Sequence, residues 1–258
     1  MAETAIRVER LGGVVRCTLD RPPLNLFEPG LIAALRSTFE TLAADPTVRL
    51  AVVTGAGRAF TGGMNVRVLY DLDAAGATAL ITSLHDAIEA VHKAPFPVIA
   101  AVNGHALGAG FELAIACDLR IAAAEATFGL PEVRVGVPSV IQAALLPPLI
   151  GPARAAELLL TGQTIGAEQA LAWGLVNRVV ERADLDAAVD SVVSAITACA
   201  PGAVRLQKQL IVRWRESDLP SAIRAGIVAF AAAYTTAEPR EGAAAFLAKR
   251  APRFGDAR

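Results

Sequence analysis

Two glutamates are the residues of this sequence best suited to acid–base chemistry. Glu112 lies inside the apolar run GFELAIAC, and Glu132 lies in FGLPEVRVGVP, where Pro131 can start a helical turn. A carboxylate in an apolar setting needs a specific reason, because burial disfavours its charge. Glu112 can instead serve the positive end of its own helix, and Arg134 can form an ion pair with Glu132. If both carboxylates reach one pocket, they supply a general acid and a general base.

Two glycine-rich segments are the second candidate for chemistry. TGAGRAFTGGMN (residues 54–65) and NGHALGAGFE (residues 103–112) each follow a predicted strand and precede a predicted helix, so both can present backbone N–H groups. Their glycines can equally serve tight turns or close packing. Neither segment has the Gly-Lys-Ser/Thr ending of a phosphate-binding loop, and only the second approaches the dinucleotide pattern. Nucleotide hydrolysis and hydride transfer are therefore disfavoured.

Histidine and cysteine usage gives no sign of a metal or disulfide site. His85, His92 and His105 form no His-x-x-x-His or Cys/His cluster, so we predict no metal. No Gly-x-Ser-x-Gly elbow for a serine nucleophile is found either. The three cysteines have no C-x-x-C spacing and are too few for a disulfide scaffold, which suits a reducing, cytoplasmic location.

Composition favours a small-molecule partner. The 258 residues, 54% hydrophobic, can bury one large core with a small appended unit. With 24 Lys and Arg against 25 Asp and Glu, the chain has no global field to hold nucleic acid or a membrane surface. The N-terminus lacks the apolar core of a secretory signal, so we expect it to stay on the mature protein. The uncharged stretches 94–111 and 135–153 are broken by Pro, Gly or Asn and are interpreted as buried loop and core.

The pattern of elements that must position these residues is α/β. Short apolar runs predict strands at residues 13–19, 50–54, 98–102 and 119–122. Apolar residues at helical spacing predict helices over residues 31–42 and 72–91, which would cover the sheet. From Gly151 onward the pattern is almost entirely helical, with one strand candidate at residues 175–180. We therefore predict a catalytic core over residues 1–195 and a helical region over residues 196–258.

Several motifs in a fixed order give the chain a family resemblance. RPPLNLF, DPTVRLAVVTGAGRAFTGGMN, VNGHALGAGFELAIACDLRIAA, FGLPE, LTGQTIGAEQALAWGLVNRVV and EGAAAFLAKR together resemble the enoyl-CoA hydratase/isomerase (crotonase) superfamily, closest to its hydratases. The resemblance implies a crotonase-like spiral of strand-strand-helix repeats. It also implies a helical C-terminal trimerisation region, often in a dimer of trimers, and an acyl-CoA thioester as the substrate.

The same resemblance assigns roles to the glycine segments and the two glutamates. It implies that the backbone N–H groups of Met64 and Ala109 hold the thioester oxygen as negative charge develops there, each worth on the order of 3 kcal/mol. Met64 and Ala109 replace the more usual alanine and glycine. Glu112 would take a proton from water attacking the β-carbon, and Glu132 would protonate the α-carbon, with no separate cofactor. Further contacts with coenzyme A or the substrate are implied at Leu24, Leu26, Phe60, Gly62, Gly63, Asn65, Gly108 and Pro131, and from a neighbouring subunit at Phe246 and Lys249.

Departures from the family pattern keep other reactions open. Ser139-Val140-Ile141-Gln142 stands where many hydratases have a glycine-rich stretch, and Asn65 replaces a frequent aspartate. The RPPLNLF loop is also shorter than usual. An enoyl-CoA isomerase, or a hydratase or hydrolase of an unusual acyl-CoA, is the alternative. A non-catalytic RNA-binding homologue is the remote alternative. It would need a basic helix, whereas HDAIEAVHK is nearly neutral, so RNA binding is disfavoured.

Overall fold

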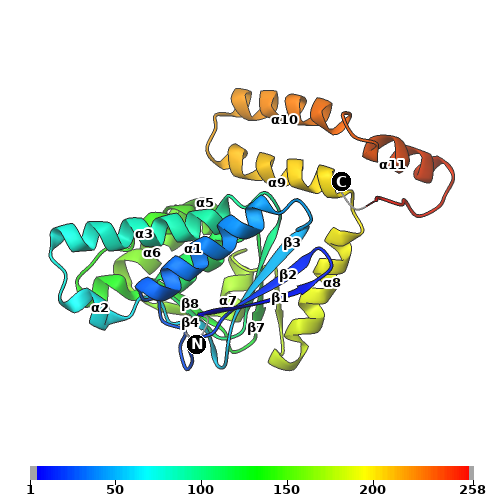
Figure 1. Cartoon of the computed structure of the whole chain (residues 1–258). Coiled ribbons are helices and arrows are strands. Elements are labelled where there is room, and N and C mark those ends of the chain that lie inside the picture. The colour runs from blue at the N-terminus through cyan, green and yellow to red at the C-terminus, as the bar shows by residue number, and fades with distance from the viewer. Residues whose placement is uncertain (1–4, 256–258) are drawn as a thin grey trace.

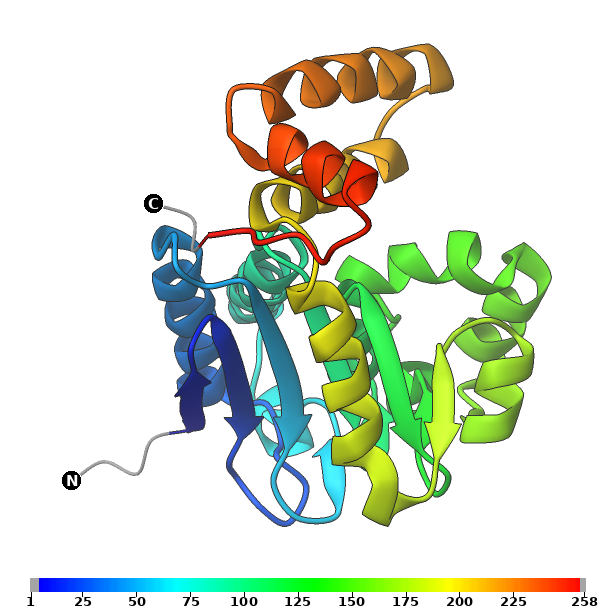
Figure 2. The ribbon, with the colours of Figure 1, turned by 90° about the vertical axis from the view of Figure 1, so that its right-hand side faces the viewer.

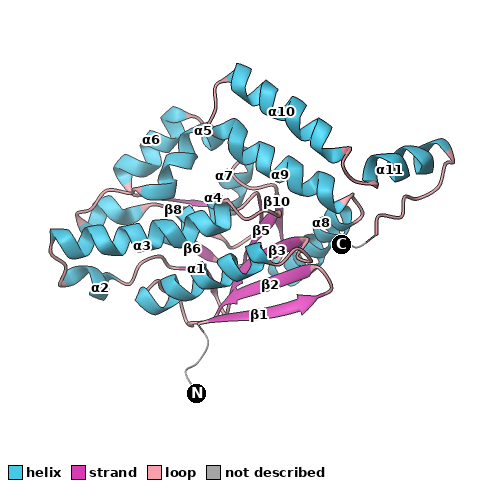
Figure 3. Cartoon of the chain, turned by 45° about the horizontal axis from the view of Figure 1, so that its top comes forward, coloured by secondary structure: helices cyan, strands magenta, loops and turns pink. Residues whose placement is uncertain are grey.

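The computed structural model describes residues 5–255, in which two β-sheets are covered by helices (Figures 1 and 3). The larger sheet has six strands, in the spatial order β1 (Ile6–Leu11), β2 (Val14–Leu19), β3 (Leu50–Gly55), β5 (Val98–Val102), β7 (Leu119–Ala123) and β10 (Arg178–Val180). Only β1 runs antiparallel to its neighbour. The five predicted strands are confirmed, whereas β1 was missed because only one of its six residues is buried.

The central strands of this sheet bury both faces. In β3, Leu50 and Val52 pack on one side and Ala51 and Val53 on the other, as the two-residue period of a strand requires. Helix α8 (Leu185–Thr197) covers the first side (Figure 2). The opposite side is covered by the main core and by α1 (Pro29–Ala44) and α3 (Ala74–His92). These two helices confirm the predictions for residues 31–42 and 72–91.

A second sheet of four short strands was not predicted strand by strand. It has the order β4 (Ala59–Thr61), β6 (His105–Leu107), β8 (Thr127–Gly129) and β9 (Thr164–Gly166). Each strand has only three residues, too few for a clear period. Three times the chain passes from the large sheet to the small one and then into a helical segment: β3, β4 and α2 (Val66–Tyr70); β5, β6 and α4 (Ala109–Ala116); β7, β8 and the 3-10 helix η1 (Pro131–Val135). This is the implied strand-strand-helix spiral, and it is confirmed.

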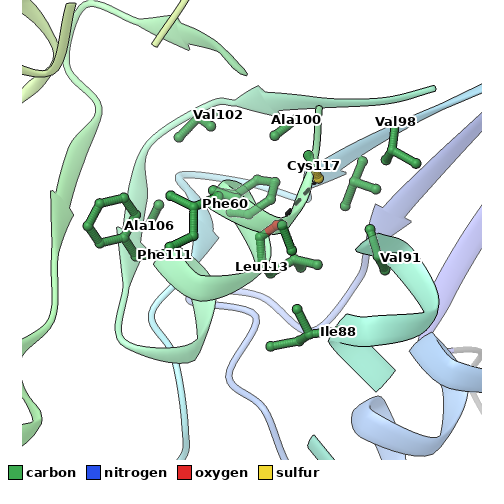
Figure 4. Packing of buried hydrophobic residues seen from close by; sticks show 14 of the residues in the cluster. Phe60, Ile88, Val91, Val98, Ala100, Val102, Ala106, Phe111, Leu113 and Cys117 are labelled. Carbon is green, nitrogen blue, oxygen red and sulfur yellow. Dashed lines mark hydrogen bonds between the residues drawn. The ribbon is translucent and has the colours of Figure 1, made fainter. Parts of the chain in front are cut away.

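Helix α4 runs through the centre of the core. All eight of its residues are buried, and Figure 4 shows Phe111 and Leu113 packed among Phe60 and Ile88. Its N-terminal turn is pressed against β4, since a Cβ on Gly110 would lie 2.6 Å from the carbonyl oxygen of Thr61. The N-terminus of α4 is therefore held close to β4.

The chain after β8 is mainly helical, and its last three helices stand apart from the sheets (Figure 1). The elements are η2 (Ile141–Leu145), α5 (Leu146–Ile150), α6 (Pro152–Thr161), α7 (Ala167–Ala172), η3 (Arg182–Asp184), α9 (Pro201–Arg215), α10 (Leu219–Ala233) and α11 (Glu238–Leu247). Helix α9 is joined to the core by Lys208, whose Nζ donates to Asp118 Oδ1 (2.7 Å) and to the carbonyl oxygen of His92 (2.8 Å). The proposed boundary at residues 195/196 falls in the last turn of α8 and stays a prediction.

Membrane-spanning potential was assessed over residues 5–255. Within that range, no single helix has both the length and the apolar character to cross a bilayer. One pair of helices, Arg182–Thr197 and Pro201–Arg215, meets the length and composition requirement only jointly, and it is bent by 108°.

Candidate active site

One apolar cavity of about 300 Å³ brings together the four residues proposed for chemistry: Met64, Ala109, Glu112 and Glu132. The rest of its wall comes from α2, the turn after it, α3 and the segment after η1, through Leu69, Leu72, Ala77, Thr78, Leu80, Ile81, Leu84, Val137, Pro138 and Val140. Apart from the two glutamates, Thr78 carries the only polar side chain of this lining, and its hydroxyl donates to the carbonyl oxygen of Ala74 in its own helix (2.9 Å). The two carboxyls therefore face an otherwise apolar space.

The two glycine segments meet at the cavity. Gly63 and Gly108 have φ angles of +87° and +53°, which residues with a Cβ rarely adopt. A Cβ on Gly63 would lie 2.5 Å from the carbonyl oxygen of Leu107 and 3.5 Å from the nitrogen of Ala109. Glycine is therefore required for close approach as well as for backbone conformation.

Within residues 5–255, no hydrogen-bond acceptor is found for the backbone N–H groups of Met64 and Ala109. Phe27 pairs with Met64 in a parallel bridge, where the Phe27 N–H donates to the Gly63 carbonyl and its own carbonyl accepts from Asn65. In such a bridge the N–H of the central residue points the other way. Ala109 is the first residue of α4, so its N–H has no acceptor within the helix. Both groups can donate to a ligand atom.

Glu112 is buried in the first turn of α4, with 3% of its surface exposed. Its Oε1 accepts a hydrogen bond from the N–H of Ala143 (3.1 Å). Burial raises the pKa of Glu112 to about 8, with a further upward contribution from the charge of Glu132, while the backbone donors of Ala143 and Val140 oppose the rise. The folded structure therefore favours the neutral form of Glu112 more than an exposed position would.

Glu132 is half-buried in η1, as expected from Pro131 at the start of this turn. Its Oε2 accepts a hydrogen bond from the Ser139 hydroxyl (2.7 Å). Its Oε1 reaches the other glycine segment, because a Cβ on Gly108 would lie 2.6 Å from this oxygen. The predicted ion pair with Arg134 is wrong: Arg134 Nε donates to the carbonyl oxygen of Thr161 (3.1 Å), and no ion pair found in residues 5–255 joins it to Glu132.

Leu24, Leu26 and Gly62, proposed as coenzyme A contacts, form one cluster. A Cβ on Gly62 would lie 3.0 Å from Leu26 Cδ2 and 3.5 Å from Leu24 Cβ, and the Gly62 N–H donates to the carbonyl oxygen of Leu24 (2.8 Å). Asn25 holds this loop in place, since its buried amide donates to the carbonyl oxygens of Ala56 and Ala59 (both 2.9 Å).

The other proposed contacts are distributed differently. The Phe60 ring is fully buried in the core (Figure 4), so only its backbone can meet a ligand. Asn65 caps α2 by accepting from the Arg67 N–H, and its Nδ2 donates to Glu28 Oε1 (2.6 Å). Phe246 is 83% exposed on α11 and Lys249 follows that helix, on the side of the molecule away from α2 (Figure 1). The chain does not itself bring these last two residues to the cavity.

Comparison with known proteins identifies the family. The model of the enoyl-CoA hydratase/isomerase family matches residues 9–257. The chain belongs to this family. It is 37% identical over 257 residues to a probable enoyl-CoA hydratase of Mycobacterium tuberculosis, covering 98% of this chain and 99% of that protein. It is 36% identical over 260 residues to a crotonyl-CoA hydratase of Syntrophomonas wolfei, with the same coverage. The crystal structure of an enoyl-CoA hydratase of Mycobacterium smegmatis matches with a TM-score of 0.95 at 34% identity, over 98% of this chain and 99% of that one.

This member of the enoyl-CoA hydratase/isomerase family is therefore an enzyme, with two free backbone donors and two carboxyl groups around one cavity. Such a set can polarise a carbonyl group and move protons on either side of it. Among residues 5–255, no group of three or more His, Cys, Asp or Glu side chains is arranged to hold a metal ion.

Sequence reasoning missed how residues 137–143 serve this site. The Ser139 hydroxyl contacts Glu132, Val140 lines the cavity, and the Ala143 N–H contacts Glu112. The departure from a glycine-rich stretch was visible, but no sequence pattern indicated that this segment donates hydrogen bonds to both carboxyl groups. The wall formed by the first half of α3 was also missed, because the apolar period of this helix was assigned only to covering the sheet.

Proposed function

We propose that this enzyme adds water to the double bond of a trans-2-enoyl-CoA and forms a 3-hydroxyacyl-CoA. The observation that carries the proposal is that Glu112 and Glu132 share one cavity with the free N–H groups of Met64 and Ala109. Relatives named as enoyl-CoA and crotonyl-CoA hydratases support the same reaction.

In the proposed reaction the thioester oxygen lies between the N–H groups of Met64 and Ala109. As water attacks the β-carbon, the electrons of the double bond move toward the carbonyl group, and negative charge gathers on this oxygen. Donors that are already oriented stabilise that charge more than they stabilise the neutral substrate, so they lower the barrier. Backbone donors keep this role with Met and Ala at these positions.

The two glutamates divide the proton transfers. Glu112 as a carboxylate accepts a proton from the attacking water, and Glu132 as a carboxylic acid gives its proton to the α-carbon; exchange with solvent then restores both groups. Burial and the nearby Glu132 raise the pKa of Glu112 to about 8, which makes its carboxylate a much stronger base than an exposed one. The reaction balances with water and these two groups, so we propose no cofactor.

The acyl group that suits the cavity is uncharged and apolar. Leucine, isoleucine, valine and methionine side chains form its wall, and the Thr78 hydroxyl is already used within α3. A charged acyl group would lose its hydration there without gaining a partner of opposite charge other than the catalytic carboxyls. We therefore propose an unsubstituted or alkyl-branched enoyl group.

We also propose that the enzyme works as a trimer or dimer of trimers built through its C-terminal helices. Large apolar side chains are exposed on α10 and α11, at Leu219, Ile223, Ile227, Val228, Phe230, Phe246 and Leu247. Such a surface is typical of contact with another protein. In this assembly Phe246 and Lys249 would reach coenzyme A in a neighbouring subunit. Light scattering on the purified protein tests the proposal, and a mass of one chain, 26.7 kDa, would contradict it.

The hydration is tested by mixing the enzyme with trans-2-enoyl-CoA thioesters of increasing chain length and following loss of the conjugated absorbance. We expect turnover by the native enzyme and a loss of about 10²–10⁴-fold in kcat for Glu112→Gln and for Glu132→Gln. Glu168→Gln, a change of the same type at an exposed position of α7, is the matched control and should retain the native rate.

Isomerisation is the competing outcome of the same experiment. A 3-enoyl-CoA would then gain conjugated absorbance while trans-2-enoyl-CoA stays unchanged. Native enzyme that fails on every trans-2-enoyl-CoA would rule out hydration, and normal turnover by Glu132→Gln would show that the role assigned to Glu132 is wrong.

A further inference from the structure

Ser139 is bonded to one of the two proposed acid–base residues. Its Oγ donates to Glu132 Oε2 at 2.7 Å. The two residues face each other because the chain turns at Gly136, which has a φ of +86° and follows η1 directly. Arg134, the nearest basic residue in sequence, is engaged with the Thr161 carbonyl instead. The Ser139 hydroxyl is therefore the side-chain donor to Glu132 in the described part of the chain.

The second carboxyl oxygen of Glu132 has a different environment. Oε1 lies over Gly108, where a Cβ would come within 2.6 Å of it. Gly108 immediately precedes Ala109, whose N–H is one of the two free donors at the cavity. Oε1 is thus close to the donor proposed for the thioester oxygen, and the α-carbon of a bound thioester would be two bonds from that oxygen.

We propose that Ser139 is a positioning residue that binds Oε2 of Glu132 and thereby directs Oε1 to the α-carbon of the substrate. This inference rests on the proposed function of Glu132 as the group that protonates this carbon. With Oε2 bonded to the hydroxyl, rotation of the carboxyl group is restricted, and Oε1 is the oxygen left to carry the transferred proton. A hydroxyl donor also stabilises the carboxylate that remains after transfer.

Two reactions test this role, and the second reports proton transfer without hydration. Hydration of trans-2-butenoyl-CoA gives kcat and KM. Exchange of the α-protons of butanoyl-CoA in deuterated water, followed by proton NMR, reports transfer between Glu132 and the α-carbon without any addition of water. The variants are Ser139→Ala, which removes the hydroxyl, and Ser139→Thr, which keeps it. Ser37→Ala is the matched control, because the Ser37 hydroxyl is exposed and donates only to the Ala34 carbonyl (3.2 Å).

We expect Ser139→Ala to lower kcat and the exchange rate about tenfold, the effect of losing one hydrogen bond to a charged group. KM should stay within about twofold, since the binding surface is kept. Ser139→Thr should recover most of both rates, and Ser37→Ala should match the native enzyme. A melting temperature of Ser139→Ala close to the native value would separate positioning from a folding defect.

Native rates of both reactions in Ser139→Ala would overturn the proposal. So would a rise in KM with unchanged kcat, or a failure of Ser139→Thr to recover activity despite native stability. If the native enzyme exchanges α-protons but does not hydrate, the proposed function fails and the exchange rates of the variants still decide the role of Ser139. If the native enzyme does neither, both proposals fail.

Discussion

The glycine segments and residues 137–143 both contribute to the wall of the same cavity, yet they are built in different ways. Gly63 and Gly108 are confined between strands and α4, and a Cβ on either would come within 2.6 Å of another atom. Residues 137–143 run from an irregular stretch into the start of η2, and Val137, Pro138 and Val140 are exposed. Within it, Ile141 has a φ of +41°, which is rare for a β-branched residue.

This difference separates backbone features that the family fold provides from side-chain contacts that depend on the residues of this chain. The glycine segments offer two backbone N–H groups, which depend on the backbone path more than on side-chain identity. Residues 137–143 offer a hydroxyl to Glu132, a backbone N–H to Glu112 and part of the apolar wall. Changes in the first region should therefore abolish activity, and changes in the second should alter protonation, acyl preference and rate.

The largest effect is expected for Gly108→Ala. The new methyl group would meet Glu132 Oε1, and the positive φ would be strained. We expect kcat for an enoyl-CoA to fall by about 10³-fold or more, since one oxyanion donor and one carboxyl group move together. Gly12→Ala is the control, because Gly12 has a φ of +58° with nothing within 4 Å of a Cβ. It should lose about 1 kcal/mol of stability and no activity. Equal losses of kcat in Gly108→Ala and Gly12→Ala would contradict the role assigned to Gly108.

The next effect concerns stability and pH. Burial and the nearby Glu132 raise the pKa of Glu112 from 4.5 to about 8 on folding. Between these values the folded chain holds a proton that the unfolded chain has released, so this group lowers stability increasingly as pH rises. Above pH 8 the cost reaches roughly 5 kcal/mol. Glu112→Gln should therefore be more stable than the native enzyme at pH 8, with the gap closing toward pH 5.

Urea denaturation at pH 5, 6.5 and 8 measures this gap. Glu168→Gln, at an exposed site, should show a difference from the native enzyme that does not vary with pH. A constant difference for Glu112→Gln would show that its burial does not perturb its protonation.

A smaller effect is expected at the cavity wall. Val140→Ala removes two methyl groups from the lining, so longer or branched enoyl groups should gain up to about tenfold in kcat/KM relative to trans-2-butenoyl-CoA. Val135→Ala, on the same side of the site but outside the cavity lining, should leave this ratio unchanged. An unchanged ratio in Val140→Ala would show that the acyl chain lies elsewhere.

The smallest effect is expected at Gln142, which joins the segment to α3. Its buried Nε2 lies 3.0 Å from His85 Nδ1 and donates to Glu89 Oε2 (3.2 Å), while its Oε1 has no partner in the described structure. Gln142→Leu loses these bonds but also removes a buried unpaired acceptor, so stability should change by less than about 1 kcal/mol. A several-fold loss of kcat is expected because the segment is less firmly held.

His85→Leu removes one of the same contacts from the other side. If Gln142 and His85 act together to hold the segment, the double variant Gln142→Leu/His85→Leu should lose little more kcat than Gln142→Leu alone. Fully additive losses would show that the two residues act independently.

Much of the fold could be predicted from local pattern. The continuous apolar run of β5 was predicted at Val98–Val102, the bounds that the structure has, because a strand buried on both faces leaves an unambiguous signal. β1 was missed because its exposed residues carry no such signal. The strands β4, β6, β8 and β9 were missed because three residues show no period, although β4 and β6 lie inside the two glycine-rich segments.

The candidate site was predicted in part, and the reason is again physical. Glu112 was detectable because it is a carboxylate in an apolar helix. Met64 and Ala109 were predicted from the glycine motifs together with the family resemblance. Ser139 was not, because a serine three residues before a buried stretch has many possible partners. The pairing of Arg134 with Glu132 was wrong because closeness in sequence does not fix the direction of a side chain in a 3-10 turn.

The sequence by itself determined the long buried strands, the helices and the types of group available for chemistry, since these depend on local pattern and residue identity. Its motifs determined the family, and the strand-strand-helix order followed from that resemblance. Tertiary structure alone decided that the two carboxyls share one cavity and that each takes a different donor from residues 137–143. It also decided the raised pKa of Glu112, because burial is a property of the packed chain. Distances between segments that meet only on folding, such as Gly63 and Gly108, cannot be read from their separation in sequence.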